Sequence, residues 1–198
     1  MPYELLTALV GFCFASSITP GPNNLMLMAS GANFGFVRSI PHMLGIGIGF
    51  VLMVILVGIG LAQIFDSYPI AHTILKVASV LYMLYLAYKI ATAAPATKGD
   101  QTGTPMTFLQ AASFQWVNPK AWTMAITAVT VYTADTSLAS ILIVGAVFGA
   151  INLPCVSCWT VLGQQMARIL TNPTRLRAFN VSMALLLIAS LYPVFLPQ

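Results

Sequence analysis

Thr19-Pro20-Gly21-Pro22-Asn23-Asn24 is a proline-rich stretch inside an apolar segment, and Asn118-Pro119-Lys120 interrupts a second apolar segment. Pro20 and Pro119 lie half a chain apart in a sequence of 198 residues, so each half carries one break at the same place. Proline removes a backbone donor and clashes with the preceding helical turn. In lipid, such a break persists only where protein or a water-lined cavity satisfies the freed backbone groups. Matched breaks in two halves therefore predict a substrate site near the midplane of a membrane transporter.

The composition places the chain in a membrane. It is 59% hydrophobic and 6% charged, with a mean hydropathy of +0.89, whereas a soluble domain carries roughly 25% charged residues. So few polar residues cannot cover a water-facing surface, and the sequence predicts an integral membrane protein. The excess of 8 basic over 4 acidic residues requires no nucleic-acid partner. The N-terminus lacks a basic region and a small-residue cleavage site, so we expect no cleavable signal peptide.

Six apolar segments are long enough for membrane spans, which need ~20 mostly apolar residues each. Their predicted ranges are 4–32, 41–63, 70–93, 106–133, 138–165 and 176–196. The first and fourth contain the proline breaks, and the loop 94–105 joins the two halves. We therefore predict an all-α integral membrane protein whose single transporter domain covers residues 1–198, with halves 1–94 and 106–198.

Positive charges gather on alternate loops. The loops after the first, third and fifth spans, with their flanks, carry Arg38, Lys89, Lys98, Arg168, Arg175 and Arg177. The opposite side carries Glu4, Asp66 and Asp135. Because positive residues collect on the cytoplasmic side, both termini are expected outside. Three spans per half then require the second half to insert upside down, so the sequence predicts two inverted three-helix repeats.

Broken helices place helix N-termini inside the membrane, where free N–H groups and a positive dipole suit an anion. Asn23 and Asn24 follow the first break, and Asn118 precedes the second. Asparagine both donates and accepts hydrogen bonds, so it can bind a carboxylate or an amine. Capping of the half-helices alone is the alternative. The remaining predicted substrate-binding positions at the breaks are Pro20, Gly21, Pro22 and Pro119.

Three further polar residues extend the predicted substrate site. Lys120 follows Pro119, and a cation at a helix N-terminus opposes the dipole, so a substrate carboxylate between them would explain it. The alternative is that Lys120 reaches the cytoplasmic interface. Lys76 lies inside the third span, where a charge is a functional candidate unless it reaches the outer surface. Asn152 interrupts the fifth span and could line the same cavity.

No Asp or Glu lies in the interior of a predicted span. Proton-coupled carriers often relay protons through buried carboxylates, so coupling here must use another group, another ion or a carboxylate at a span end. The same absence predicts a small, uncharged or zwitterionic amino acid as the substrate, because nothing would balance a cationic side chain.

The thiols and imidazoles indicate neither a disulfide framework nor a metal site. Cys13, Cys155 and Cys158 are odd in number and lie in apolar segments, where thiols behave as small apolar groups. His42 and His72 are predicted near opposite ends of the second span, too far apart to share a metal. We expect no cofactor, no metal and no enzymatic activity.

Several stretches carry a resemblance to a known family. The run at 19–24 resembles the signature of the LysE/RhtB family of amino-acid exporters. Leu75-Lys76-Val77 with Leu81-Tyr82 is similar to the family's third span, and the run 114–120 is similar to its central motif. Cys158-Trp159, Gly163 and Arg168 resemble the end of the fifth span in the cysteine and O-acetylserine exporter subgroup. The resemblance covers nearly the whole chain.

The resemblance implies a bacterial inner-membrane carrier that exports small amino acids or their derivatives, driven by the proton gradient. Its implied partners are the amino-acid substrate, H⁺ and membrane lipids, and a homo-oligomer is compatible with the sequence. The functional positions that it implies are Pro20, Gly21, Pro22, Asn23, Asn118, Pro119 and Lys120. Some members have an aspartate in the fifth span where this chain has Asn152, which leaves the coupling mechanism and the substrate open.

Two other functions stay open at this point. Aquaporin-like channels also combine inverted halves with Asn-Pro at half-helix starts, although there the motif follows the second and fifth spans. A transmembrane thiol relay would place cysteines at the breaks, whereas Cys13 lies seven residues before Pro20. Replacing the three cysteines separates a carrier from a relay.

Overall fold

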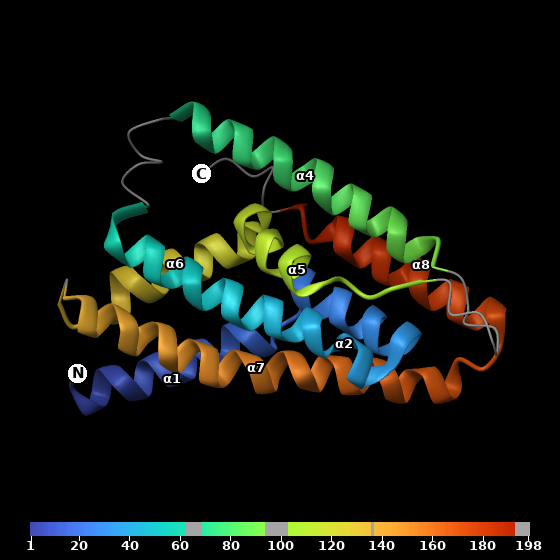
Figure 1. Ribbon diagram of the computed structural model, residues 1–198, viewed down its shortest axis with the longest axis horizontal. Coiled ribbons are helices and arrows are strands. Elements are labelled where there is room, and N and C mark those ends of the chain that lie inside the picture. The colour runs from blue at the N-terminus through green and yellow to red at the C-terminus, as the bar shows by residue number, and fades with distance from the viewer. Residues whose placement is uncertain (62–68, 94–102, 136, 193–198) are drawn as a thin grey trace.

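The computed structural model describes residues 1–61, 69–93, 103–135 and 137–192, which form helices and no strands. The all-α prediction is therefore confirmed for this part of the chain. The helices run mainly along the long axis of the molecule (Figure 1). In chain order they are α1 (Tyr3–Ile18), α2 (Pro22–Leu56), the π-helical turn η1 (Val57–Leu61), α4 (Pro69–Ala91), α5 (Phe108–Phe114), the 3-10 turn η2 (Gln115–Val117), α6 (Pro119–Tyr132), α7 (Leu138–Ile169) and α8 (Pro173–Ala189).

Both proline motifs break a helix where the sequence predicts it. α1 ends at Ile18 and α2 begins at Pro22, with extended backbone at Thr19 and Gly21. η2 ends at Val117 and α6 begins at Pro119, and Asn118 between them is extended (φ −91°, ψ 108°). Proline suits the first position of a helix because its missing N–H would have no intrahelical partner there. Each motif therefore stops one helix and starts the next within a few residues.

Gly35 divides α2 into two arms that run in opposite directions. Its backbone has φ 79° and ψ 173°, a conformation that only glycine adopts readily. The hydroxyl oxygens of Ser30 and Ser39 lie 2.8 Å apart across the reversal. The prediction of a loop between the first two spans is wrong. A single glycine makes the turn, so the helix resumes before the predicted start at residue 41 and includes Arg38.

Glycines bring the first arm of α2 against α7. A Cβ added to Gly31 would lie 2.1 Å from the carbonyl oxygen of Thr160, and one added to Gly163 would lie 2.0 Å from that of Met28. Real Cβ atoms do not approach backbone oxygens so closely, so both positions require glycine. Small residues allow this backbone contact between membrane helices.

Glycines also bring the second arm of α2 against α5. A Cβ at Gly45 would lie 2.4 Å from the carbonyl oxygen of Phe108, and one at Gly49 would lie 2.6 Å from the Cα of Ala112. These glycines therefore allow close helix packing. The contact holds α5 against α2, next to the second break.

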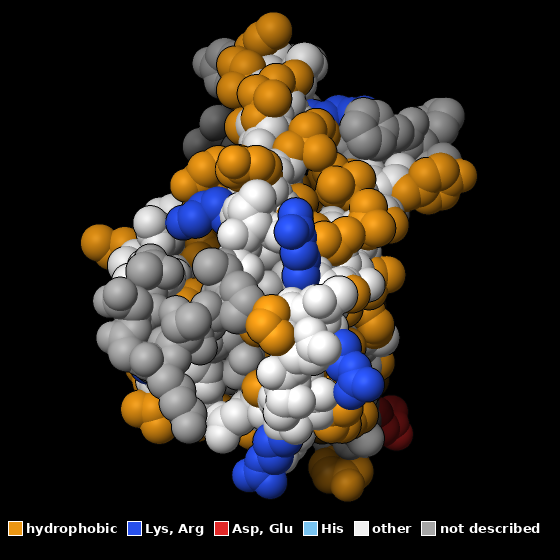
Figure 2. Space-filling view, turned by 90° about the vertical axis from the view of Figure 1, so that its right-hand side faces the viewer, with side chains coloured by type: hydrophobic (Ala, Val, Ile, Leu, Met, Phe, Trp, Pro, Cys, Tyr) orange, Lys and Arg blue, Asp and Glu red, His pale blue; other side chains and the backbone are white. Residues whose placement is uncertain are grey.

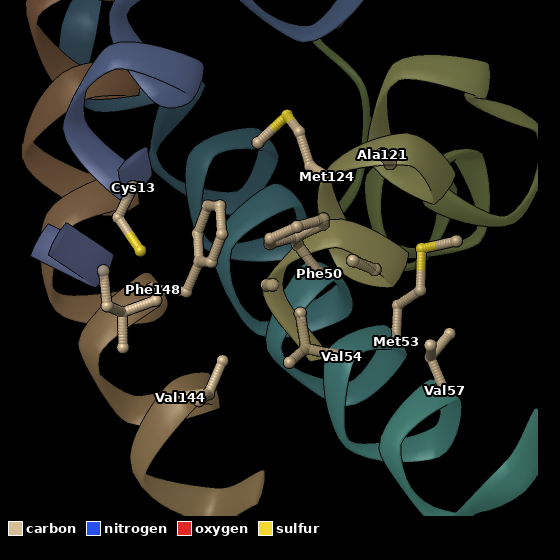
Figure 3. Close-up of a cluster of buried hydrophobic side chains, with 12 residues drawn as sticks. Cys13, Phe50, Met53, Val54, Val57, Ala121, Met124, Val144 and Phe148 are labelled. Carbon is tan, nitrogen blue, oxygen red and sulfur yellow. The ribbon is translucent and has the colours of Figure 1, made fainter. Parts of the chain in front are cut away.

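An apolar core joins α1, α2, α6 and α7 (Figure 3). Phe50 and Phe148 meet edge to face at its centre, with ring centroids 4.7 Å apart, a favoured arrangement for aromatic pairs. The buried members of this core are Leu9, Cys13, Phe50, Met53, Val54, Val57, Ala121, Met124, Ala125, Ala128, Val144 and Phe148. It fixes the two broken helices relative to each other.

The outer surface is suited to lipid. Within the described residues, the helical stretches Pro22–Leu61, Thr73–Ala91 and Leu138–Ile169 are long and apolar enough to cross a membrane, and α1 is a shorter apolar helix. Large apolar side chains point outward from the bundle, including Ile74 and Leu81 of α4, each 63% exposed. A soluble monomer rarely exposes so much apolar surface.

Basic residues gather at one end of the bundle. Figure 2 looks onto the end at the right of Figure 1 and shows Lys and Arg side chains across it, with acidic colour only at its margin. The Gly35 reversal, the end of α4 with Lys89 and the end of α7 with Arg168 lie there. Asp66, Ser67 and Lys98 lie outside the described residues.

The turn between α6 and α7 lies at the opposite end of the bundle and carries Asp135. Its carboxylate accepts hydrogen bonds from the backbone N–H and the hydroxyl of Ser137. These bonds, with one from Ser140, lower the pKa of Asp135 to about 2. An acidic group therefore stays ionised next to the N-terminus of α7, where the helix dipole favours it.

We predict that Gly163→Ala destabilises the protein. The new methyl group would meet the carbonyl of Met28 and force α2 and α7 apart, and overpacking typically costs about 1–3 kcal/mol. The thermal midpoint of the purified protein in detergent should fall. Gly11→Ala is the matched control, because nothing lies within 4 Å of a Cβ there and alanine favours a helix by up to about 1 kcal/mol. Equal midpoints for the two variants would contradict the close contact.

Candidate substrate site at the two helix breaks

The broken end of α1 has a hydrogen-bond donor for each backbone carbonyl from Ala15 to Pro20. Asn24 of α2 donates from Nδ2 to the carbonyls of Ser17 and Thr19, at 2.8 Å each. The last carbonyls of a helix have no intrahelical partner, and in lipid there is no water to replace one. Asn24 therefore caps the C-terminal end of α1.

Two more helices contribute donors to the same end. Trp159 of α7 donates its indole N–H to the carbonyl of Ile18 at 3.0 Å. The Lys120 ammonium of α6 reaches the carbonyl of Thr19 at 3.0 Å, its hydroxyl oxygen at 2.9 Å and the carbonyl of Pro20 at 3.2 Å. Three acceptors match the three N–H donors of an ammonium group.

The position of Lys120 follows from the dipole of α1 rather than from that of its own helix. A cation is favourable at a helix C-terminus, and the ammonium lies at that end of α1. Gly21 makes room for the side chain to cross, since a Cβ there would lie 2.7 Å from Lys120 Cδ. In this structure the Lys120 ammonium extends to the first break.

A pair of amides joins the two breaks directly. Asn23 donates from Nδ2 to Oε1 of Gln115 at 2.8 Å, and Gln115 Nε2 returns a hydrogen bond to Asn23 Oδ1 at 3.2 Å. Gln115 is completely buried and also donates to the carbonyl of Ala111. Sequence reasoning assigned no role to Gln115. Gln115 lies three residues before Asn118 and is the one polar residue in the run 114–117 that precedes the break. This pattern could have indicated a polar partner for the first break.

Both half-helices begin at this junction. Asn118 caps α6, because its Oδ1 accepts the backbone N–H of Lys120 at 3.2 Å. Gly21, at the corresponding position before α2, offers no side-chain cap. The first turn of α2 therefore presents N–H groups without a side-chain acceptor, the arrangement that binds anions at helix N-termini.

Asn152 of α7 contributes a polar atom without a partner. Its Nδ2 donates to the hydroxyl of Ser17 at 3.2 Å, whereas its buried Oδ1 has no partner among the described residues. The residue is only 5% exposed. An unsatisfied buried acceptor costs roughly 1–3 kcal/mol, so this oxygen is suited to an added donor.

Most of these groups surround one small cavity, although Gln115 and Trp159 do not line it. Its lining consists of Ser16, Ser17, Gly21, Asn23, Asn24, Phe50, Asn118, Lys120, Ala121, Met124, Asn152 and Val156. The cavity measures about 20 Å³, room for about one water molecule. An amino acid does not fit in this volume. Lys120 is the one charged residue in this lining, which contains no carboxylate.

The other predicted site residues lie outside the lining. Pro20, Pro22 and Pro119 shape the backbone at the two breaks without facing the cavity. Lys76 lies on the exposed side of α4, away from the breaks.

The cysteines do not gather at the breaks either. All three are free: Cys13 and Cys155 are buried, Cys158 is exposed, and none lines the cavity. The described residues hold no cluster of three or more His, Cys, Asp or Glu side chains that could bind a metal ion.

Comparison with known proteins identifies the family. The profile of the LysE type translocator family matches residues 14–190, most of the chain. The chain belongs to the LysE family of translocators. It is 30% identical to a cysteine/O-acetylserine efflux protein of Escherichia coli O157:H7, over 98% of this chain and 100% of the relative. The protein of that name in Escherichia coli strain K12 is 29% identical over the same shares. No solved structure matches.

Membership of the LysE family fits the apolar helices and the exposed apolar surface, and the protein is a multi-pass membrane translocator. The resemblance noted from the proline motifs is confirmed. The profile includes both breaks and every residue of the cavity lining, because it extends from residue 14 to residue 190.

We predict that Asn24→Ala destabilises this LysE-family protein. The change removes the donor to the carbonyls of Ser17 and Thr19, and leaving buried acceptors unsatisfied costs roughly 1–3 kcal/mol. The thermal midpoint in detergent should fall. Thr123→Ala is the control, because its exposed hydroxyl bonds only within α6 and exposed substitutions usually stay within about 0.5 kcal/mol. An unchanged midpoint for Asn24→Ala would mean that water satisfies these carbonyls.

Proposed function

We propose that this protein is a secondary transporter that exports small amino acids or their derivatives in exchange for protons. The observation that carries the proposal is the cavity where both breaks meet. It combines uncapped helix N–H groups, one cation and one acceptor without a partner, with no carboxylate. This set complements a zwitterion whose side chain carries no positive charge.

The substrate carboxylate would accept hydrogen bonds from the first turn of α2 and from Lys120. Its ammonium group would donate to Asn152 Oδ1, the acceptor that has no partner among the described residues. Asn23 would orient the ligand from the side, in competition with its hydrogen bonds to Gln115. Because the cavity has room for about one water, substrate binding requires the residues around it to move apart.

The relatives support a substrate of this size and charge. They are named for efflux of cysteine and O-acetylserine, both small zwitterionic amino acids. The lack of a carboxylate in the lining supports the same class and argues against lysine and arginine as good substrates of the proposed carrier. Robust, saturable export of lysine by the purified protein would contradict the assignment.

The proposed arrangement is a single domain of six spans in two inverted halves, in a bacterial inner membrane, with both termini outside. The course of the chain supports it. α1 and the first arm of α2 run toward the basic end, whereas α5 and α6, the corresponding elements of the second half, run away from it (Figure 1). The concentration of Lys and Arg at that end supports a cytoplasmic location for it.

We predict the topology that reporter fusions should find. Fusions at Gly35, Lys98 and Thr171 should report the cytoplasm, and fusions at Ser67 and Asp135 should report the outside. The physical reason is the retention of Lys and Arg on the cytoplasmic side. A cytoplasmic C-terminus would exclude both the six spans and the inverted repeat.

We predict that Lys120→Ala loses substrate binding and transport. Removing a group that bonds a charged ligand costs roughly 1.5–3 kcal/mol, or about tenfold to hundredfold in affinity. Asn23→Ala should be weakened in the same way. Lys120→Arg should also lose activity, because a planar guanidinium does not match the three acceptors that surround the compact ammonium group. Binding and counterflow in proteoliposomes measure these effects.

Two controls accompany these variants. Lys89→Ala removes a cation at the basic end of α4, far from the breaks, and should transport like the parent. A variant with Cys13, Cys155 and Cys158 changed to alanine should also transport, whereas its inactivity would favour a thiol relay. If Lys120→Ala binds and transports like the parent, Lys120 only caps the C-terminal end of α1 and does not bind the substrate.

A further inference from the structure

Uncharged oxygens at the C-terminal end of α1 hold the Lys120 ammonium. They are the carbonyl and hydroxyl oxygens of Thr19, at 3.0 and 2.9 Å, and the carbonyl oxygen of Pro20, at 3.2 Å. An ammonium group donates three hydrogen bonds, and the partial negative charge at a helix C-terminus favours a cation. The end of α1 therefore has the geometry and the charge of a binding site for a primary ammonium group.

Other contacts hold the acceptors of this site in place. Asn24 donates from Nδ2 to the carbonyls of Ser17 and Thr19, at 2.8 Å each. The hydroxyl of Thr19 donates to the carbonyl of Ser16 at 3.1 Å, which directs its lone pairs toward the Lys120 ammonium. Removal of the Lys120 side chain would thus leave these contacts intact, with three acceptors directed at the same point.

The site can be reached by a ligand. Thr19 and Pro20 are exposed, and Gly21 beside them lines the cavity between the breaks. The Lys120 side chain crosses Gly21, where a Cβ would lie 2.7 Å from Lys120 Cδ. The space that this side chain fills therefore joins the cavity to the three acceptors.

The run 19–24 presents acceptors and donors for both charges of a zwitterion. Thr19 and Pro20 supply carbonyl oxygens at the end of α1, and α2 begins at Pro22. The first turn of α2 presents N–H groups without a side-chain acceptor. In an α-amino acid one carbon joins the ammonium group to the carboxylate, so their binding sites must lie side by side. The first break provides two such sites with opposite partial charges.

We propose that the broken end of α1 binds primary ammonium groups, that of Lys120 in this structure and that of the substrate during transport. The part that concerns the substrate rests on the proposed function. The substrate carboxylate binds the first turn of α2, and the Lys120 ammonium leaves α1 to join it. The substrate ammonium then donates to the acceptors that Lys120 leaves, and its remaining N–H donates to Asn152 Oδ1.

The first test asks whether this site binds an ammonium group that is not attached to the chain. In Lys120→Ala, n-propylammonium replaces the atoms that the substitution removes. It should raise the thermal midpoint of the purified variant saturably, relative to tetramethylammonium, which has the same charge but no N–H donor. The parent and Lys89→Ala, in which Lys120 fills the site, should show no such difference. Equal midpoints of Lys120→Ala in the two salts, over the whole range that the parent tolerates, overturn the proposal.

A second substitution locates the site. Thr19→Val in the Lys120→Ala protein removes one of the three acceptors at nearly constant shape. The propylammonium concentration that gives half of the rise should increase about tenfold, as is typical for a hydrogen bond to a charged group. Thr123→Val in the same protein is the matched control, because its hydroxyl bonds within α6. Equal concentrations for the two double variants overturn the assignment to the end of α1.

The substrate part is tested on the unmodified protein, so that it does not depend on the folding of a variant. Serine, 2-methylserine and N,N,N-trimethylserine compete with radiolabelled O-acetylserine for the purified protein. Trimethylation keeps the charge of the amine but removes every N–H, so it should weaken competition at least about tenfold. 2-Methylserine adds bulk beside the amine but keeps its three N–H donors, and it should compete nearly as well as serine.

The outcomes separate this proposal from the proposed function. Failure of O-acetylserine, cysteine and a panel of other small amino acids to bind overturns the proposed function and the substrate part with it. Rescue of Lys120→Ala by propylammonium would still establish the ammonium site. Equal competition by serine and N,N,N-trimethylserine overturns the substrate part alone.

Discussion

The structure depends on satisfying the backbone carbonyls where α1 stops inside the membrane. Donors come from three other helices: Asn24 of α2, Lys120 of α6 and Trp159 of α7. A helix end without them would be prohibitively unfavourable in lipid. The break in α1 therefore exists only in the assembled bundle, and the helices that support it are brought together at the same point. The cavity between them is a direct result of this requirement.

The proline motifs predicted the breaks and their meeting point because helix interruption is a local property of proline. Six of the predicted site residues, Gly21, Asn23, Asn24, Asn118, Lys120 and Asn152, line one cavity. What the sequence could not predict were the partners. The pairing of Asn23 with Gln115 and the extension of Lys120 to α1 depend on how helices pack across 92 and 101 positions of sequence. The single-residue reversal at Gly35 was missed, since it depends on a backbone angle rather than on a composition typical of loops.

The groups that hold the breaks are also the groups proposed to hold the substrate. Lys120 bonds the end of α1, and Asn23 bonds Gln115. A bound carboxylate or amine would exchange some of these internal hydrogen bonds for hydrogen bonds to itself. Binding of such a ligand would thereby be linked energetically to the attachment of one half to the other.

The contacts between the helices differ in stiffness. Between the first arm of α2 and α7, backbone meets backbone at Gly31 and Gly163. We therefore expect these two helices to move together as one rigid unit. The cluster that holds α4 and α8 to the rest contains the flexible side chains of Met26 and Met83, with Phe114, leucines and alanines around them. Methionine adapts its shape at little energetic penalty. We therefore expect α4 and α8 to move most easily relative to the other helices during transport, while the first arm of α2 and α7 keep their mutual position.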